Sequence, residues 1–311
     1  MADTYDVIIL GGGNAGSGVS AIVHEAGKKI AFVEELDFGG TCPNRGCTPK
    51  KVLVAAAHAL HEIEMAATHG IKVGKPKLDW AKLIRREKDM ISFIPGAMEG
   101  LAEKRGDVFK GSAKFTGPNA VEVNGRVLEG ENIVIATGSK PRPLPIPGAE
   151  HMITSDEVLS EESQPGEVVF IGGGVIAMEF SHVYARAGTK VTILEVMERL
   201  LPRVEADAVA AVQTESERIG VTVKTSVTVK EITKTNGKLQ VVYEHDGKEM
   251  TLNADRVVNG AGRIANVGLR LRLSTRPFLS ADGNQQGRRY PDSEHRQQAV
   301  GDNCPGHSPW R

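Results

Sequence analysis

Short, continuous apolar runs alternate along this chain with longer segments in which apolar residues recur every three or four positions. The runs at residues 5–10 and 29–34 predict buried parallel strands, and the segment between them predicts a helix that ends near Gly27. The same order recurs at residues 167–171 and 190–194. The chain is therefore predicted to be an α/β protein with two tandem Rossmann-like units.

Each unit also has a region of short alternating runs separated by turn residues. Residues 107–129 and about 221–258 follow this pattern, which predicts an antiparallel meander in each unit. Two helices are predicted before the first meander, at residues 41–68 and at residues 80–104, the second of them interrupted near Pro95.

A proline-rich stretch at residues 140–147 separates the two units. We expect the first domain at residues 1–147 and the second at residues 148–266. Over its final thirty residues the chain has a single Ile, Leu, Val, Met or Phe, so residues 267–311 are predicted to be an irregular tail without a core. The abrupt loss of pattern favours a shifted reading frame or a truncated gene over a native tail.

Composition narrows the classes of function. The 311 residues carry 38 basic and 39 acidic side chains, which argues against a nucleic-acid partner. No apolar run approaches the ~20 residues of a membrane span, and no signal peptide is visible, so we expect a cytoplasmic protein without a membrane partner. Three cysteines are too few for a disulfide framework, and a close pair is expected to be catalytic or metal-binding.

A glycine loop follows the first strand and opens the first helix. Its glycines allow a tight turn and a close backbone approach, and the helix N-terminus then faces a pyrophosphate. An acid at the end of the next strand can accept hydrogen bonds from a ribose; Glu34 has this position, with Glu35 as a substitute. The candidate residues of this nucleotide site are Gly11, Gly13, Asn14, Ala15, Gly16 and Glu34.

The second unit repeats the arrangement. Glu195 lies as far beyond Gly172 as Glu34 lies beyond Gly11, and an acid there favours the 2′-hydroxyl of NAD(H) over the 2′-phosphate of NADP(H). Arg199 and Arg203 follow closely enough to keep NADP(H) open as an alternative. The candidate residues are Gly172, Gly174, Val175, Ile176 and Glu195.

Cys42 and Cys47 lie five residues apart, directly after the first nucleotide-binding unit. A dithiol at this position can reach the ring of a bound flavin, and a helix N-terminus with nearby lysines is expected to lower a cysteine pKa. The alternative is a metal site that adds His58 and His61, but a second cysteine pair at zinc spacing is missing, so no metal is expected.

Residues of about 4–266 resemble the flavoprotein, or pyridine nucleotide-disulfide, oxidoreductases, which include dihydrolipoamide dehydrogenase, glutathione reductase and mercuric reductase. The resemblance rests on both glycine loops, the redox loop Gly39–Pro49 and the strand end at residues 136–138. It implies FAD in the first unit and a nicotinamide cofactor in the second, with electrons passing through a Cys42–Cys47 disulfide to a substrate disulfide. Cys47 would be the thiolate beside the flavin and Cys42 the interchange thiol.

The resemblance implies further site residues. Lys50 or Lys51 would pair with Glu179 near the flavin, and the remaining cofactor contacts would come from Gly40, Thr41, Ala136, Thr137, Gly138, Gly262 and Arg263. Val175 and Glu195 favour a small-molecule or lipoyl disulfide of the dihydrolipoamide type, whereas Pro49-Lys50-Lys51 favours the glutathione type. Pro43 and Arg45 fit neither type.

Intact members of the family are longer than this chain and are expected to homodimerise through a further domain that supplies a His–Glu acid/base pair. Gly301-Asp302 is a candidate for the family's second FAD contact, whereas His295, His307 and Cys304 have no expected role. Two alternatives to the disulfide oxidoreductase therefore remain open: a dinucleotide-binding fragment without turnover, and a diaphorase that does not use the dithiol.

Overall fold

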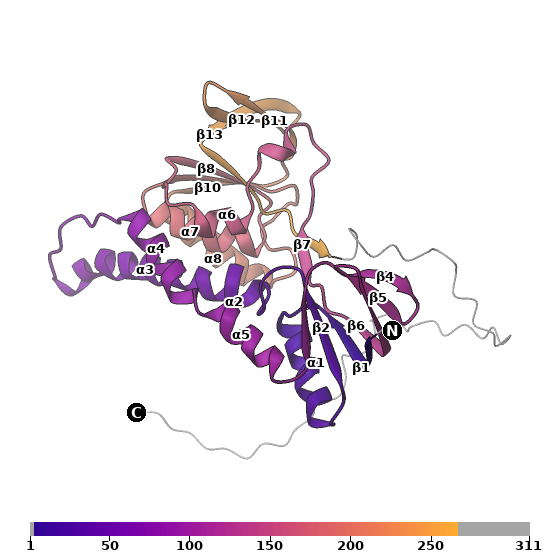
Figure 1. Cartoon of the computed structure of the whole chain (residues 1–311). Helices are drawn as coiled ribbons and strands as arrows, with labels where there is room; N and C mark the ends of the chain where they lie inside the picture. The colour runs from indigo at the N-terminus through magenta and orange to yellow at the C-terminus, as the bar shows by residue number, and fades with distance from the viewer. Residues whose placement is uncertain (1–2, 267–311) are drawn as a thin grey trace, which may run out of the picture. The chain divides into compact units, whose positions relative to one another are not determined.

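The computed structural model describes residues 3–266, which form two α/β halves (Figure 1). The first half has a six-stranded sheet in the order β3-β2-β1-β6-β5-β4. In chain order its strands are β1 (Asp3–Leu10), β2 (Ile30–Glu34), β3 (Asp107–Lys110), β4 (Lys114–Gly117), β5 (Ala120–Val123) and β6 (Arg126–Ile135). The pairs among β3, β2, β1 and β6 are parallel, and β5 and β4 continue antiparallel from β6.

The strand β1 is buried on both faces, which explains its continuous apolar run. Ile8 and Leu10 pack into one hydrophobic cluster, and Val7 and Ile9 pack into another on the opposite face. Neighbouring side chains of a strand point to opposite faces, so an alternating polar residue would have entered a core.

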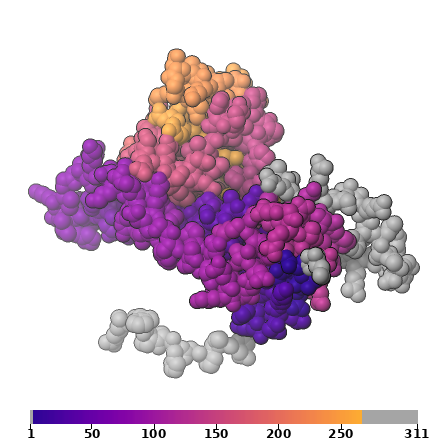
Figure 2. Space-filling view, viewed as in Figure 1, coloured from indigo at the N-terminus to yellow at the C-terminus, as the bar shows by residue number. Residues whose placement is uncertain are grey.

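The second half contains a parallel sheet and a separate antiparallel one. The parallel sheet has the order β10-β9-β8-β14. Its strands are β8 (Glu167–Ile171), β9 (Lys190–Leu194), β10 (Val221–Lys224) and β14 (Arg256–Asn259). The antiparallel sheet consists of β11 (Thr228–Thr235), β12 (Lys238–His245) and β13 (Lys248–Ala254), whose orange atoms form one exposed end of the surface in Figure 2.

The α/β class with two Rossmann-like units and their meanders is confirmed, but both predicted meanders were too long. The first of them began with β3, which is a parallel neighbour of β2. The second included β10 and β14, which are parallel strands of the main sheet. Short alternating runs do not distinguish an edge strand of a parallel sheet from a strand of a meander, because both expose one face.

The helices begin close to the predicted positions and are more divided. In chain order they are α1 (Asn14–Glu25), α2 (Thr41–Arg45), α3 (Cys47–Met65), η1 (Ala66–His69), α4 (Trp80–Ile91), α5 (Ile94–Glu103), η2 (Ala149–His151), α6 (Ser155–Ser160), α7 (Val175–Arg186) and α8 (Ala206–Arg218). The predicted helix 41–68 is broken at Gly46, whose φ and ψ are −149° and −111°. The predicted helix 80–104 is interrupted near Pro95 as expected, since α4 ends at Ile91 and α5 begins at Ile94. Pro95 itself lies in the first turn of α5, where its missing N–H costs nothing.

Helices α3 and α4 precede the proline-rich stretch, yet they pack against the second half. Leu53 of α3 and Leu83 of α4 belong to the same buried cluster as Phe170 of β8. Trp80 stacks on Tyr184 of α7 with ring centroids 5.0 Å apart, and its Nε1 donates to the carbonyl of Glu161. The redox segment is therefore anchored on the second α/β unit.

Two short strands connect the halves. β7 (Ser139–Pro141) and β15 (Arg263–Ala265) pair antiparallel where the chain enters and leaves the second half. Within residues 3–266, no helix is long and apolar enough to cross a membrane.

Candidate active site

The first glycine loop is built from backbone contacts that exclude a side chain. Gly11 has a φ of +111°, and a Cβ there would lie 2.3 Å from the carbonyl oxygen of Ala136. A Cβ on Gly16 would lie 2.0 Å from the carbonyl oxygen of Gly11. Helix α1 starts at Asn14 with Gly13 as N-cap and no side-chain cap, so its first N–H groups are available for an anion.

Glu34 is held at the edge of this loop by two backbone donors. Its Oε2 accepts from the N–H of Gly12 at 2.6 Å, and its Oε1 accepts from the N–H of Leu36 at 2.7 Å. Glu34 is therefore the acid that contacts the loop, whereas Glu35 is exposed. A carboxylate fixed in this way still has lone pairs for a ribose diol.

The second loop repeats these contacts atom by atom. Oε2 of Glu195 accepts from the N–H of Gly173 at 2.5 Å, and Oε1 accepts from the N–H of Met197 at 2.8 Å. A Cβ on Gly172 would lie 2.6 Å from the backbone of Gly260. Helix α7 also starts without a side-chain cap, behind the N-cap Gly174.

Gly12, Gly173 and Gly260 contribute to the two loops and were not among the sequence candidates. The first two occupy a variable position of the glycine motif, where only the tertiary contact with the acid reveals their part. Gly260 occupies beside Gly172 the place that Ala136 occupies beside Gly11.

The redox loop lies directly against the first glycine loop. The N–H of Gly39 donates to the carbonyl of Gly12 at 2.9 Å, and Gly13 and Gly39 form an isolated bridge. A Cβ on Gly40, whose φ is +66°, would lie 2.7 Å from the Cα of Gly13. Glycine is thus required at this crossing, which brings the cysteines next to the first nucleotide site.

The two cysteines lie together as free thiols. Cys42 is in the first turn of α2 and Cys47 is the first residue of α3. A hydrogen bond with the Cys42 side chain raises the pKa of Cys47, burial adds to this, and the charge of Lys50 opposes it. The predicted lowering of a cysteine pKa is therefore wrong for Cys47 in this reduced pair, because the neighbouring sulfur outweighs the lysine.

The structure distinguishes the two candidate lysines. Nζ of Lys50 lies 2.5 Å from Oε1 of Glu179, and this pair joins α3 to α7. Lys51, one residue further around the helix, is exposed.

The remaining candidates lie around these loops. The N–H of Ala136 donates to the carbonyl of Leu10, and the Thr137 hydroxyl donates to the carbonyl of Asn266. Arg263 donates to the hydroxyl and the carbonyl of Ser139. At the starts of the helices and directly before β7 and β15, the partly or fully exposed candidates are Asn14, Ala15, Thr41, Gly138, Val175, Ile176 and Gly262.

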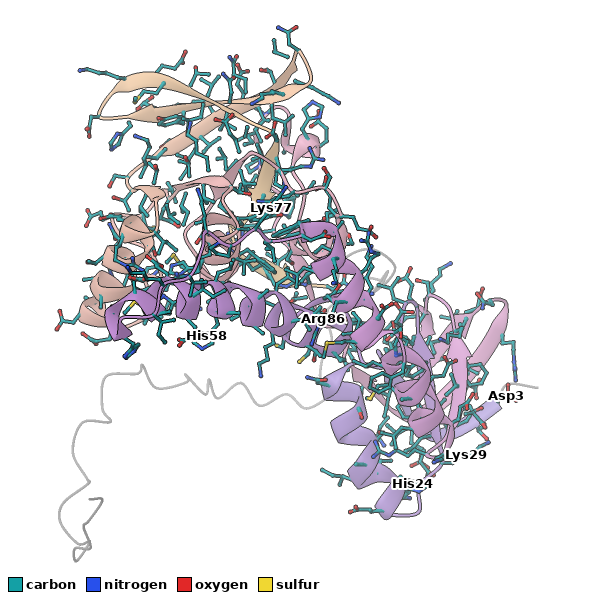
Figure 3. The ribbon with its side chains drawn as sticks, turned by 90° about the vertical axis from the view of Figure 1, so that its left-hand side faces the viewer. Asp3, His24, Lys29, His58, Lys77 and Arg86 are labelled. Atoms are coloured by element: carbon teal, nitrogen blue, oxygen red, sulfur yellow. The ribbon has the colours of Figure 1, made fainter. Side chains whose placement is uncertain are left out.

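The metal alternative finds no support in the described part of the chain. His58 lies on the exposed side of α3 (Figure 3), and its nearest charged partner is Glu62. No group of three or more His, Cys, Asp or Glu residues among residues 3–266 could hold a metal ion. Gly301, Asp302, His295, His307 and Cys304 lie outside the described residues.

These geometries fit two dinucleotides. Each half offers a side-chain-free crossing at the end of a strand, an uncapped helix N-terminus and a carboxylate pinned by backbone N–H groups. The first of these sites has a dithiol beside it. The arrangement suits one cofactor that exchanges electrons with a disulfide and a second one that delivers them.

Comparisons with known proteins agree with this arrangement. Dihydrolipoyl dehydrogenase of Acholeplasma laidlawii is 33% identical over 274 residues, which cover 86% of this chain and 80% of that relative. Dihydrolipoyl dehydrogenase of Mycoplasma pneumoniae is 34% identical over 274 residues, which cover 84% of this chain and 58% of the relative. The HOCl-induced flavoprotein disulfide reductase RclA from Escherichia coli superimposes with a TM-score of 0.75 at 28% identity, over 87% of this chain and 59% of that one.

The chain thus spans more than half, but mostly less than two thirds, of the length of these relatives. The family model described as pyridine nucleotide-disulphide oxidoreductase matches residues 5–285. The family implies FAD and a nicotinamide cofactor, in agreement with the two sites. The chain belongs to the pyridine nucleotide-disulphide oxidoreductase family.

Proposed function

We propose that this chain is an FAD-dependent oxidoreductase that passes electrons from a nicotinamide cofactor to a substrate disulfide. The observation that carries the proposal is the pair of free, interacting thiols of Cys42 and Cys47 beside the first glycine loop. Two thiols in contact next to a nucleotide site are suited to reversible disulfide formation. We assign residues 1–147 to FAD and residues 148–266 to the nicotinamide cofactor, with α3 and α4 packed on the second half.

In the overall reaction, NAD(P)H, a proton and a substrate disulfide give NAD(P)+ and two substrate thiols. Bound FAD supplies the electron relay between the nicotinamide and the protein's dithiol. Cys42 attacks one substrate sulfur as a thiolate and releases the other as a thiol, and Cys47 then displaces the second thiol as the Cys42–Cys47 disulfide forms. Lys50 favours the thiolate of Cys47, because its charge acts to lower that pKa.

We propose NADH as the electron donor. Glu195 is 7% exposed and would repel a 2′-phosphate. The guanidinium of Arg199 donates to the carbonyls of Leu201, Pro202 and Val204, so it is engaged within its own loop. The kcat/KM for NADH is expected to exceed that for NADPH; a preference for NADPH would contradict this assignment and point to the exposed Arg203.

We propose a disulfide of the lipoamide type as the substrate, in a cytoplasmic setting. The support comes from Val175, a non-aromatic residue at the start of α7, and from the names of the relatives. NADH-driven reduction of lipoamide and of glutathione disulfide should be compared directly. Faster turnover of glutathione disulfide would reverse this assignment and leave the disulfide oxidoreductase itself intact.

The proposed function is tested with the purified 311-residue chain. A flavin absorption spectrum that gains a long-wavelength band on anaerobic addition of NADH would show that FAD, nicotinamide and dithiol communicate. The Cys42→Ser and Cys47→Ser variants should then lose disulfide reduction. Disulfide turnover that survives both substitutions refutes the proposal, and NADH oxidation with quinones alone identifies a diaphorase.

A further inference from the structure

Four residues lie between the cysteines, and three of them, Pro43, Asn44 and Arg45, have no role in the proposed function although each has a contact. The ring of Pro43 packs so close to Gly39 that a Cβ added to Gly39 would lie 2.9 Å from it. Nδ2 of Asn44 donates to the carbonyl of Phe38 at 2.9 Å. Arg45, the last residue of α2, forms ion pairs with two carboxylates.

Helix α2 depends on its contacts with other segments because it is too short to be stable alone. It has five residues and no side-chain cap, and glycines flank it at both ends. A single helical turn is unfavourable on its own, and flanking glycines add conformational freedom. Cys42 lies within this turn, so its position relative to Cys47 depends on what anchors the turn.

Arg45 connects this turn to two other elements. Its Nη1 lies 3.4 Å from Oδ2 of Asp37, in the loop that leads from Glu34 to the redox segment. Its Nε lies 3.8 Å from Oδ2 of Asp156, in the first turn of α6 in the second half. A capping box between Thr154 and Glu157 fixes that turn of α6.

Asp156 depends on Arg45 for charge compensation. The carboxylate is half-buried, and burial raises its pKa above the usual range. Arg45 has the largest effect that lowers this pKa. The charge of Glu157 raises the pKa, and Arg263 lowers it by less than Arg45 does. Arg263 is itself bonded to Ser139, so Arg45 is the partner of Asp156 that comes from the redox turn.

We propose that Arg45 is a positioning residue for the interchange thiol: by bridging Asp37 and Asp156 it holds the turn that carries Cys42 in the geometry from which Cys42 and Cys47 join. The inference rests on the proposed function for the part that Cys42 takes. Partly exposed ion pairs contribute modestly, so the effect belongs to the geometry of the thiol pair more than to global stability.

The test is the thiol–disulfide equilibrium of the purified full chain in glutathione redox buffers, read by thiol trapping and mass spectrometry of the Cys42–Cys47 peptide. Arg45→Met is expected to lower the effective concentration of one thiol toward the other about two- to fivefold, the factor that corresponds to the free energy of ion pairs of this exposure. Arg45→Lys keeps the charge and should restore at least half of the loss. Asp156→Asn should lower the effective concentration as well. In the double variant of Arg45→Met and Asp156→Asn, the effective concentration should fall no further than in Arg45→Met alone.

Arg85→Met is the matched control, because Arg85 is an exposed arginine of α4 that pairs with a different carboxylate, Glu162, at 3.0 Å. An Arg45→Met value equal to that of the control, additive losses in the double variant, or no recovery with Arg45→Lys would overturn the inference. The thiol–disulfide equilibrium is measured without turnover. It therefore tests the role of Arg45 separately from the proposed function, which fails if the Cys42→Ser variant still reduces disulfides.

Discussion

Glu87 makes a pH-dependent contribution to stability whose sign and size follow from its position. It lies on the buried stripe of α4 with Trp80, Leu83 and Ile84, and it is 2% exposed. In the described part of the chain no hydrogen bond or ion pair reaches its carboxyl group, and Lys88 is the one charge that opposes the effect of burial. Burial raises the pKa of Glu87 from 4.5 to about 7.

The folded state therefore binds this proton more tightly than the unfolded state does. The contribution of Glu87 to the free energy of unfolding is complete below the unfolded pKa of 4.5 and is lost as the pH rises through about 7. A pKa difference of about 2.5 corresponds to a loss of about 3 kcal/mol at alkaline pH, at 1.36 kcal/mol for each pKa unit.

Glu87→Gln removes the titration and keeps the shape of the side chain. At pH 5 the stabilities of the variant and the parent should differ by less than about 1 kcal/mol. At pH 8.5 it should be more stable by up to about 3 kcal/mol. The measurement is urea unfolding followed by circular dichroism at several pH values, with the exposed Glu103→Gln on α5 as the matched control. A difference between Glu87→Gln and the parent that stays constant from pH 5 to pH 8.5 would refute the reasoning.

Three further outcomes are expected. Lys50→Met should slow disulfide reduction by about tenfold or more, consistent with the ~1.5–3 kcal/mol of a charged hydrogen bond. Lys51→Met should stay near the parent rate, and equal rates for the two variants would contradict the pairing of Lys50 with Glu179. Gly16→Ala should abolish binding of added FAD, measured by fluorescence, because the new Cβ would clash with backbone; retained binding would contradict the close packing. At Gly18 the space is open, so Gly18→Ala should instead stabilise α1 by about 0.5–1 kcal/mol. Trp80→Ala should cost about 3–5 kcal/mol of unfolding free energy, and a loss below about 1 kcal/mol would show that α4 is not anchored as described.

The parts of the site that the sequence predicted are local in the chain. A strand, a glycine turn and a helix place the acid of the next strand beside the turn, and this geometry is the same in every βαβ unit. Glu34 and Glu195 could therefore be chosen from spacing alone, and the structure gives both of them the same backbone donors. The redox loop was likewise recognisable from residues that are neighbours in sequence.

Other features depend on contacts between distant segments. Whether Lys50 or Lys51 meets Glu179 is set by the rotation of α3 against α7, which two adjacent lysines do not reveal. The pKa of Cys47 depends on the distance to Cys42, and the expected effect of helix and lysine was reversed by that contact. The role of Arg45 required Asp156, which lies more than a hundred residues away in the chain.

By itself, the sequence determined the α/β class, the duplicated nucleotide-binding plan and the identity of the dithiol, because hydrophobic period, turn residues and short motifs act within a few tens of residues. The tertiary structure alone decided that α3 and α4 pack against the second half, with Trp80 stacked on Tyr184. An amphipathic helix shows that one of its faces will be buried but not which surface will cover it, since many apolar surfaces bury similar area. Packing and long-range ion pairs make that choice, and they hold α3, which begins at Cys47, against the second half.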